Sequence, residues 1–165
     1  RPGPGVIRAM PNTPSSIGQG MSVCYAPTAT AAQRTLCTRL LRAVGDVAWI
    51  EQEDQMDVVT AISGSGPAYV FLLAELLEQV GTMEGLPPTL ARQIARQTVA
   101  GAGALMLRSG VDADTLRRNV TSPGGTTQQA LEVLMAPDAW PATLSTAIRA
   151  AARRARELSG ALPVS

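Results

Sequence analysis

The sequence contains no histidine and no lysine, and its fourteen basic residues are all arginine. Within this chain, that excludes catalysis by a histidine base, a Ser-His-Asp triad, a lysine Schiff base or a lysine phosphate clamp. Aromatic residues make up only 3% of the chain, although 45% of its residues are apolar. The core must therefore be built from Ala, Leu, Val, Ile and Met, which indicates close helix–helix packing.

Several binding classes are also disfavoured. A formal net charge of +1 gives no basic surface for nucleic acid. Cys24 and Cys37 are the only cysteines, and without histidine they cannot assemble a zinc site, so we expect buried free thiols. No apolar run approaches the roughly 20 residues that span a bilayer, and Arg1–Gly5 indicates a loop rather than a signal peptide. We expect a soluble, cytoplasmic protein that holds no metal and binds neither nucleic acid nor membrane.

Residues 6–51 show a mixed pattern of short strands and one helix. A helix is predicted over residues 31–44, with Gly45 as its stop, and a turn over Pro11–Pro14. So few elements cannot form an independent α/β domain, and they look like the last third of a larger sheet. The predicted strands are Val6–Met10, Met21–Tyr25 and Val47–Ile50.

From Asp54, a good N-cap residue, the pattern is helical throughout. The run Ser63–Gly66 is predicted to break the chain between the first two helices, with Pro67 in the first turn of the second. Gly101 and Gly103 would be costly in an exposed helix, so they predict another helix backbone passing close by, for example at a subunit interface. The predicted helices cover about residues 54–62, 67–81, 87–107, 112–119, 126–135 and 137–158.

The loop Val120–Thr127 is the strongest candidate for a binding site. It carries four hydroxyl side chains, a proline and the adjacent glycines Gly124 and Gly125, which can reach positive φ and let a ligand approach the main chain. The helix that follows points its unpaired N–H groups and positive dipole end at the same place. A small anion fits such a loop. An ordinary helix connection with Ser and Thr caps also accounts for the residues and is the commoner origin of such a loop, so both interpretations stay open at this point.

Several longer motifs occur along the chain in a fixed order. They are RAMPNTP (8–14), TAISGSGPAYVF (60–71), GLPPTLARQIARQTVAGAGALML (85–107), NVTSPGGTTQQALEVL (119–134) and the closing AARRARELS. Together they resemble the C-terminal half of pyrroline-5-carboxylate reductases, and the resemblance spans essentially the whole chain. No strand–GxGxxG–helix is present, so the resemblance covers a chain from which the N-terminal cofactor-binding portion is largely missing.

The resemblance implies a mainly helical fold of two parts. Residues 1–53 would be the C-terminal remnant of a Rossmann-type cofactor domain. Residues 54–165 would be an all-helical dimerisation and substrate-binding domain. Members of the family form homodimers with interleaved helices, which can build larger assemblies, and Gly101 and Gly103 would lie at a close crossing within such a dimer.

The resemblance also implies a reaction and the residues that support it. The family transfers a hydride from NADPH or NADH to the imine carbon of 1-pyrroline-5-carboxylate, which gives L-proline in the last step of proline biosynthesis. Because the cofactor supplies the hydride, the protein mainly binds and orients, and it needs no strong base. Ser122, Gly124, Gly125 and Thr126 would hold the carboxylate, and Thr127, as the catalytic residue, would hydrogen-bond the substrate nitrogen. Many family members have Ala at the position of Thr126, so its backbone matters more than its side chain.

Two further segments would face the cofactor. Met10, Pro11 and Asn12 follow a strand end, where such folds place ligands, and would lie near the nicotinamide. Asn119 would reach the cofactor of the partner subunit. Two alternatives remain, namely another imine or keto-acid dehydrogenase, or a non-catalytic helical fragment that dimerises and binds an anion. We expect the 165-residue chain to be inactive by itself.

Overall fold

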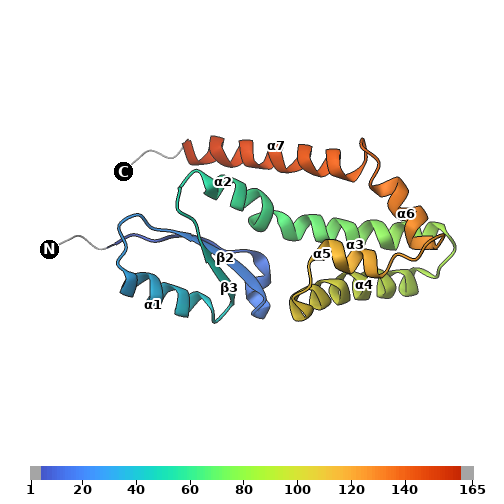
Figure 1. The fold of residues 1–165 in the computed structure, drawn as a ribbon, viewed down its shortest axis with the longest axis horizontal. Coiled ribbons are helices and arrows are strands. Elements are labelled where there is room, and N and C mark those ends of the chain that lie inside the picture. Colours follow the sequence, from blue (N-terminus) through green and yellow to red (C-terminus); the bar gives the residue numbers. More distant parts are fainter. Residues whose placement is uncertain (1–4, 161–165) are drawn as a thin grey trace. The chain divides into compact units, whose positions relative to one another are not determined.

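The computed structural model describes residues 5–160, and it divides into two compact units. The first unit comprises residues 1–67 and 146–165, and the second comprises residues 68–145. A loop was predicted at the N-terminus, and residues 1–4 of that prediction lie outside the described part of the chain. Figure 1 shows the order of the elements along the sequence. The predicted fold class, mainly helical after a small remnant of an α/β sheet, is confirmed.

The first unit contains a three-stranded sheet in the order β1-β2-β3. Strand β1 pairs antiparallel with β2, and β2 pairs in parallel with β3. Parallel neighbours need a crossover connection, which here is α1. A capping box starts α1, since the Thr30 hydroxyl accepts the Gln33 N–H while the Gln33 amide oxygen accepts the Thr30 N–H at 2.8 Å. The bounds are β1 Arg8–Met10, η1 Thr13–Ile17, β2 Gly20–Tyr25, α1 Ala31–Leu41 and β3 Gly45–Trp49.

The helical part follows from residue 55. Its elements are α2 Gln55–Val59, η2 Thr60–Gly64, α3 Gly66–Met83, α4 Pro88–Ser109, α5 Ala113–Asn119, α6 Thr126–Leu134 and α7 Trp140–Gly160. Each of the six predicted helices has a helical counterpart, but the first two are joined through η2. In the second unit α3 and α4 lie side by side, since Arg92 of α4 forms an ion pair with Glu78 of α3 at 2.9 Å.

The predicted break at Ser63–Gly66 is wrong. The segment Thr60–Gly64 is a π-helical turn, closed by the Ser65 N–H donating to the Thr60 carbonyl at 2.8 Å. An i→i+5 bond of this kind absorbs one extra residue without ending the helix. Residues 55–83 are therefore helical almost without interruption. Asp54 precedes this helix as expected, but its side chain makes no capping hydrogen bond.

The helix Gln55–Met83 also departs from the expectation that no apolar run is long enough to span a bilayer. It is 29 residues long, with a mean hydropathy of 1.3 over its most apolar window, and only 11% of that window is buried. By length and composition alone it could cross a membrane. The sequence pattern therefore does not exclude a spanning segment, and the open question is what covers this helix.

Large apolar side chains are mostly exposed in the described chain. The fully buried core is small and includes Cys24 of β2 and Met56 of α2. Around Gly101 and Gly103 of α4 there is open space, because a Cβ at either position would meet nothing within 4 Å. The predicted close helix crossing is thus not formed within the described residues of the second unit. The exposed apolar side chains of α3 are Val70, Phe71, Leu72, Leu76, Leu77, Val80 and Met83.

Candidate active site

The candidate loop connects α5 to α6 through a tight turn. Its entry is fixed by Thr121, whose N–H donates to the Arg118 carbonyl at 3.0 Å and whose hydroxyl donates to the Arg117 carbonyl at 2.6 Å. Gly124 adopts φ 69°, a left-handed conformation that favours glycine. Gly125 has an ordinary φ of −82°, but a Cβ there would collide with the Ser122 hydroxyl. Gly124 is thus favoured by its positive φ, whereas a side chain at Gly125 would require the Ser122 hydroxyl to move.

Two of the predicted carboxylate-binding amides already have partners within the loop. The Gly125 N–H donates to the Ser122 carbonyl at 3.0 Å, which closes the turn. The Gly124 N–H donates to the side-chain oxygen of Gln128 at 2.7 Å. A ligand at either amide would have to replace that acceptor. The role of Gly124 and Gly125 in binding stays a prediction, and their conformational role is visible.

The first turn of α6 keeps its N–H groups open. Its N-cap is Gly125, which has no side chain, and no side-chain capping bond is made, whereas Thr30 closes the corresponding position of α1. The first N–H groups of a helix have no partner inside the helix. The amides of Thr126 and Thr127 therefore begin the helix without a cap, beside the positive end of the helix dipole. An anion with two acceptor atoms suits this position.

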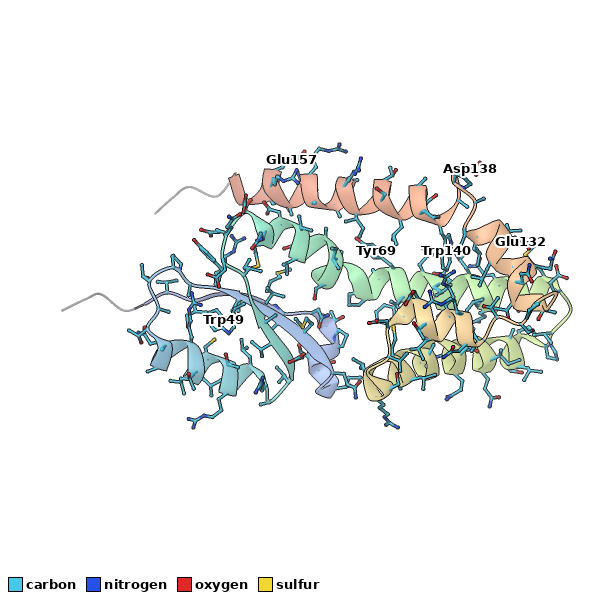
Figure 2. All side chains as sticks on the ribbon, viewed as in Figure 1. Trp49, Tyr69, Glu132, Asp138, Trp140 and Glu157 are labelled. Carbon is cyan, nitrogen blue, oxygen red and sulfur yellow. The ribbon has the colours of Figure 1, made fainter. Side chains whose placement is uncertain are left out.

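Gln128 and Glu132 are two site residues that the sequence interpretation missed. The Gln128 amide nitrogen donates to Glu132 at 3.0 Å, and the neighbouring Gln129 donates to the other oxygen of the same carboxylate at 3.3 Å. Figure 2 shows the Glu132 side chain on α6. A glutamine three residues after an N-cap is the second half of a capping box, so the spacing from Gly125 to Gln128 was the available signal.

The charge beside the loop is positive. Arg118 pairs with Asp114 at 2.6 Å, one turn earlier on α5. Arg117 instead directs its guanidinium to the sulfur of Met135 and has no carboxylate partner among residues 5–160. This uncompensated cation lies in the last turn of α5, so it favours an anion near the loop.

The second group of predicted residues lies in the first unit. Met10 ends β1, and Asn12 follows Pro11 in the turn after that strand. The Asn12 side chain joins two segments, because its oxygen accepts the Met21 N–H at 2.9 Å and its nitrogen donates to the Ser63 carbonyl at 3.3 Å. Asn119 is in the second unit, as the exposed last residue of α5. The predicted cofactor residues are thus divided between the two units.

The cysteines lie apart from both groups. Cys24 is a fully buried free thiol, as predicted, whereas Cys37 is free but only half-buried. Burial raises the pKa of the Cys24 thiol to about 11, with the charge of the neighbouring Cys37 and a hydrogen bond to it as smaller causes. Among residues 5–160 no three His, Cys, Asp or Glu side chains gather where a metal ion could bind.

Residues 53–158 match the family model described as pyrroline-5-carboxylate reductase dimerisation. Over 93% of its length the chain is 43% identical to the pyrroline-5-carboxylate reductase of Pseudomonas aeruginosa and 44% identical to that of Arabidopsis thaliana. It covers 56% and 55% of those two proteins. The chain therefore spans about half the length of the curated relatives it matches.

Solved structures give the same comparison. A pyrroline-5-carboxylate reductase from Coxiella burnetii matches with a TM-score of 0.89 and 42% identity, over 93% of this chain and 57% of that one. A Plasmodium falciparum pyrroline carboxylate reductase with NADP bound matches with a TM-score of 0.81 and 29% identity, over 94% of this chain and 62% of that one.

Proposed function

This chain belongs to the pyrroline-5-carboxylate reductase family, and we propose that it forms the substrate-binding and dimerising part of such a reductase. The reaction is the NADPH- or NADH-dependent reduction of 1-pyrroline-5-carboxylate to L-proline. The observation that supports it best is the open first turn of α6. It follows a loop with a left-handed Gly124 and lies beside the unpaired Arg117.

The substrate fits the chemistry of this loop. It is small and carries one carboxylate, which the amides at the start of α6 and the Ser122 hydroxyl would bind together with Gly124, Gly125 and Thr126. Thr127, half-buried in the first turn of the helix, would hydrogen-bond the ring nitrogen. Holding that nitrogen orients the imine carbon toward the donor, which is a positioning contribution rather than acid–base catalysis.

The nicotinamide cofactor supplies the hydride when it is bound. Met10, Pro11 and Asn12 fit its reactive end, since they follow the end of a sheet strand, and Asn119 would contribute from a partner subunit. The described residues offer no Gly-rich turn for the pyrophosphate. We therefore assign this chain only one edge of the cofactor site, with Met10, Pro11 and Asn12 in the Rossmann-type remnant that ends near residue 53 and Asn119 in the helical domain.

A second copy of the chain is the proposed cover for the apolar face of α3. Dimerisation with interleaved helices would bury Phe71, Leu72 and Leu76, and it would bring another backbone against Gly101 and Gly103 of α4. Covering this face with protein rather than lipid fits an aqueous location, and we propose that this location is the cytoplasm. The net charge of +1 favours no nucleic-acid partner.

The test uses the chain joined behind the N-terminal half of the Pseudomonas aeruginosa relative. We expect this fusion to oxidise NADPH with 1-pyrroline-5-carboxylate and to form L-proline, and we expect the 165-residue chain alone neither to turn over nor to bind NADPH tightly. Turnover of 2-keto acids instead would identify another dehydrogenase. A fusion that binds L-proline without reducing the imine would favour the non-catalytic alternative, and tight NADPH binding by the chain alone would contradict the missing cofactor site.

A further inference from the structure

The π-helical turn Thr60–Gly64 lies just before Pro67, a residue that has no backbone N–H. In a regular α-helix the Ser63 carbonyl would accept the N–H of residue 67, so Pro67 removes that donor. A half-buried carbonyl is stabilised by a hydrogen-bond donor, and a side chain from elsewhere in the fold can supply one. The sequence therefore favours a side-chain donor at Ser63.

Asn12 supplies that donor from 51 residues away. Its side-chain nitrogen donates to the Ser63 carbonyl at 3.3 Å and lies 3.4 Å from the Ser63 hydroxyl oxygen. Its side-chain oxygen accepts the N–H of Met21, the second residue of β2, at 2.9 Å. One amide thus connects the turn after β1 to the start of β2 and to the π-helical turn.

Gly64 provides a second contact between the same two segments. A Cβ at Gly64 would come within 2.6 Å of the terminal methyl carbon of Met10, so the absence of a side chain leaves room for Met10. Met10 and Asn12 flank Pro11, and both contact the π-helical turn. The turn after β1 is therefore held from two sides by residues 63 and 64.

We propose that Asn12 is a positioning residue that fixes the Met10–Asn12 segment against the π-helical turn, and that its side chain does not itself bind the cofactor. Both ends of the amide are engaged within the protein, so contact with the nicotinamide falls to the main chain of this segment and to Met10. The functional half of this inference rests on the proposed reductase activity. The structural half, the coupling of Asn12 to Pro67 through the Ser63 carbonyl, does not.

The structural half is tested by a double-mutant cycle in the 165-residue chain with Asn12→Ala and Pro67→Ala. Asn12→Ala should lower Tm by about 5 °C, since it removes the side-chain hydrogen bonds to the Ser63 carbonyl and to the Met21 N–H. In the Pro67→Ala background an N–H is present at residue 67, so the same change should lower Tm by about half as much. Ser16→Ala, which removes only a local hydrogen bond to Thr13 in the same loop, is the matched control and should show no coupling to Pro67→Ala.

Asn12→Asp keeps an acceptor for Met21 but cannot donate to Ser63, so it should behave like Asn12→Ala and show the same rescue. Equal losses of Tm in both backgrounds, for both Asn12 variants, would overturn the inference. This result would leave the proposed reaction untouched, because no turnover is measured.

The functional half is tested by kinetics that distinguish a loss of positioning from a loss of stability. In the fusion enzyme Asn12→Ala should lower kcat about tenfold while the KM for 1-pyrroline-5-carboxylate stays within about twofold, since a displaced segment costs orientation. Adding Pro67→Ala should recover about half of the lost Tm but none of the lost kcat, because the carbonyl gains a donor while the segment stays untethered. Recovery of kcat together with Tm would overturn the positioning role. A fusion with no turnover in the unmutated form would instead count against the proposed function.

Discussion

Replacing Gln128 with Met tests how the candidate loop is held. The change removes the oxygen that accepts the Gly124 N–H at 2.7 Å and the amide that donates to Glu132 at 3.0 Å. Gln and Met have similar helix propensities and similar lengths, so α6 itself should form as before. What is lost is the bond that restrains Gly124 in its left-handed conformation.

The expected size follows from one hydrogen bond. A typical intramolecular hydrogen bond contributes about 1 kcal/mol net, and an exposed amide such as that of Gly124 regains part of this from water. If losing this bond raised the free energy of ordering the loop by the full value of about 1 kcal/mol, substrate binding would weaken about fivefold, since 1.4 kcal/mol corresponds to a factor of ten. We therefore expect the KM for 1-pyrroline-5-carboxylate to rise about threefold to fivefold in the fusion enzyme, with kcat within about twofold.

Gln129→Met is the matched control. The Gln129 side chain bonds to the same Glu132 carboxylate at 3.3 Å, and its only contact with the loop is the backbone N–H that donates to the Gly125 carbonyl, which Met keeps, so its replacement should leave KM unchanged. Titrating L-proline into the isotope-labelled 165-residue chain gives a reading without turnover, in which the Thr126 and Thr127 amide resonances should shift more than that of Gly124. Tighter binding by Gln128→Met would refute the reasoning, because it would show that Gln128 competes with the ligand for the Gly124 N–H.

Three further predictions concern other parts of the chain. Thr127→Val in the fusion enzyme should lower kcat for imine reduction at least tenfold and leave the dissociation constant of NADPH nearly unchanged, and a normal rate would remove Thr127 from its role. Because burial raises the pKa of Cys24 to about 11, above the ordinary value of 9.0, the stabilisation from its neutral thiol is present below pH 9 and is lost as pH rises toward 11. Tm measured over this range should fall less steeply for Cys24→Ala, and parallel curves would contradict the assignment. Leucine at both Gly101 and Gly103 meets nothing within the chain, so sedimentation should show a folded monomer in place of a dimer, and an intact dimer would place these glycines outside the interface.

Local patterns were enough to predict the helices. The apolar spacing of α3 and the prolines before α4 placed those elements within a few residues of their observed bounds. The break at Ser63–Gly66 was predicted because two glycines and two serines have weak helix propensity. That prediction failed because the π-helical turn and its neighbours override this propensity. Propensity describes each residue alone, whereas this turn is supported by Asn12, which is distant in sequence.

The candidate loop was predictable as a loop, but its internal bonding was not. The positive φ of Gly124 follows from its sequence context. The use of its N–H by Gln128 depends on which side-chain rotamer reaches back over the first turn, and the sequence offers only the spacing of a capping box as a hint. Which amides are left for a ligand therefore became visible only in three dimensions.

The π-helical turn also lets this helix carry one residue more than its side-chain phase requires. In a regular α-helix, which advances 3.6 residues per turn, an added residue would rotate all later side chains by about 100°. The wider turn at Thr60–Gly64 takes up that rotation locally. Deleting a single residue from Thr60–Gly64 would therefore restore a regular α-helix without redirecting the apolar side chains that follow it. What such a deletion would remove is the wide turn itself and its contact with Asn12.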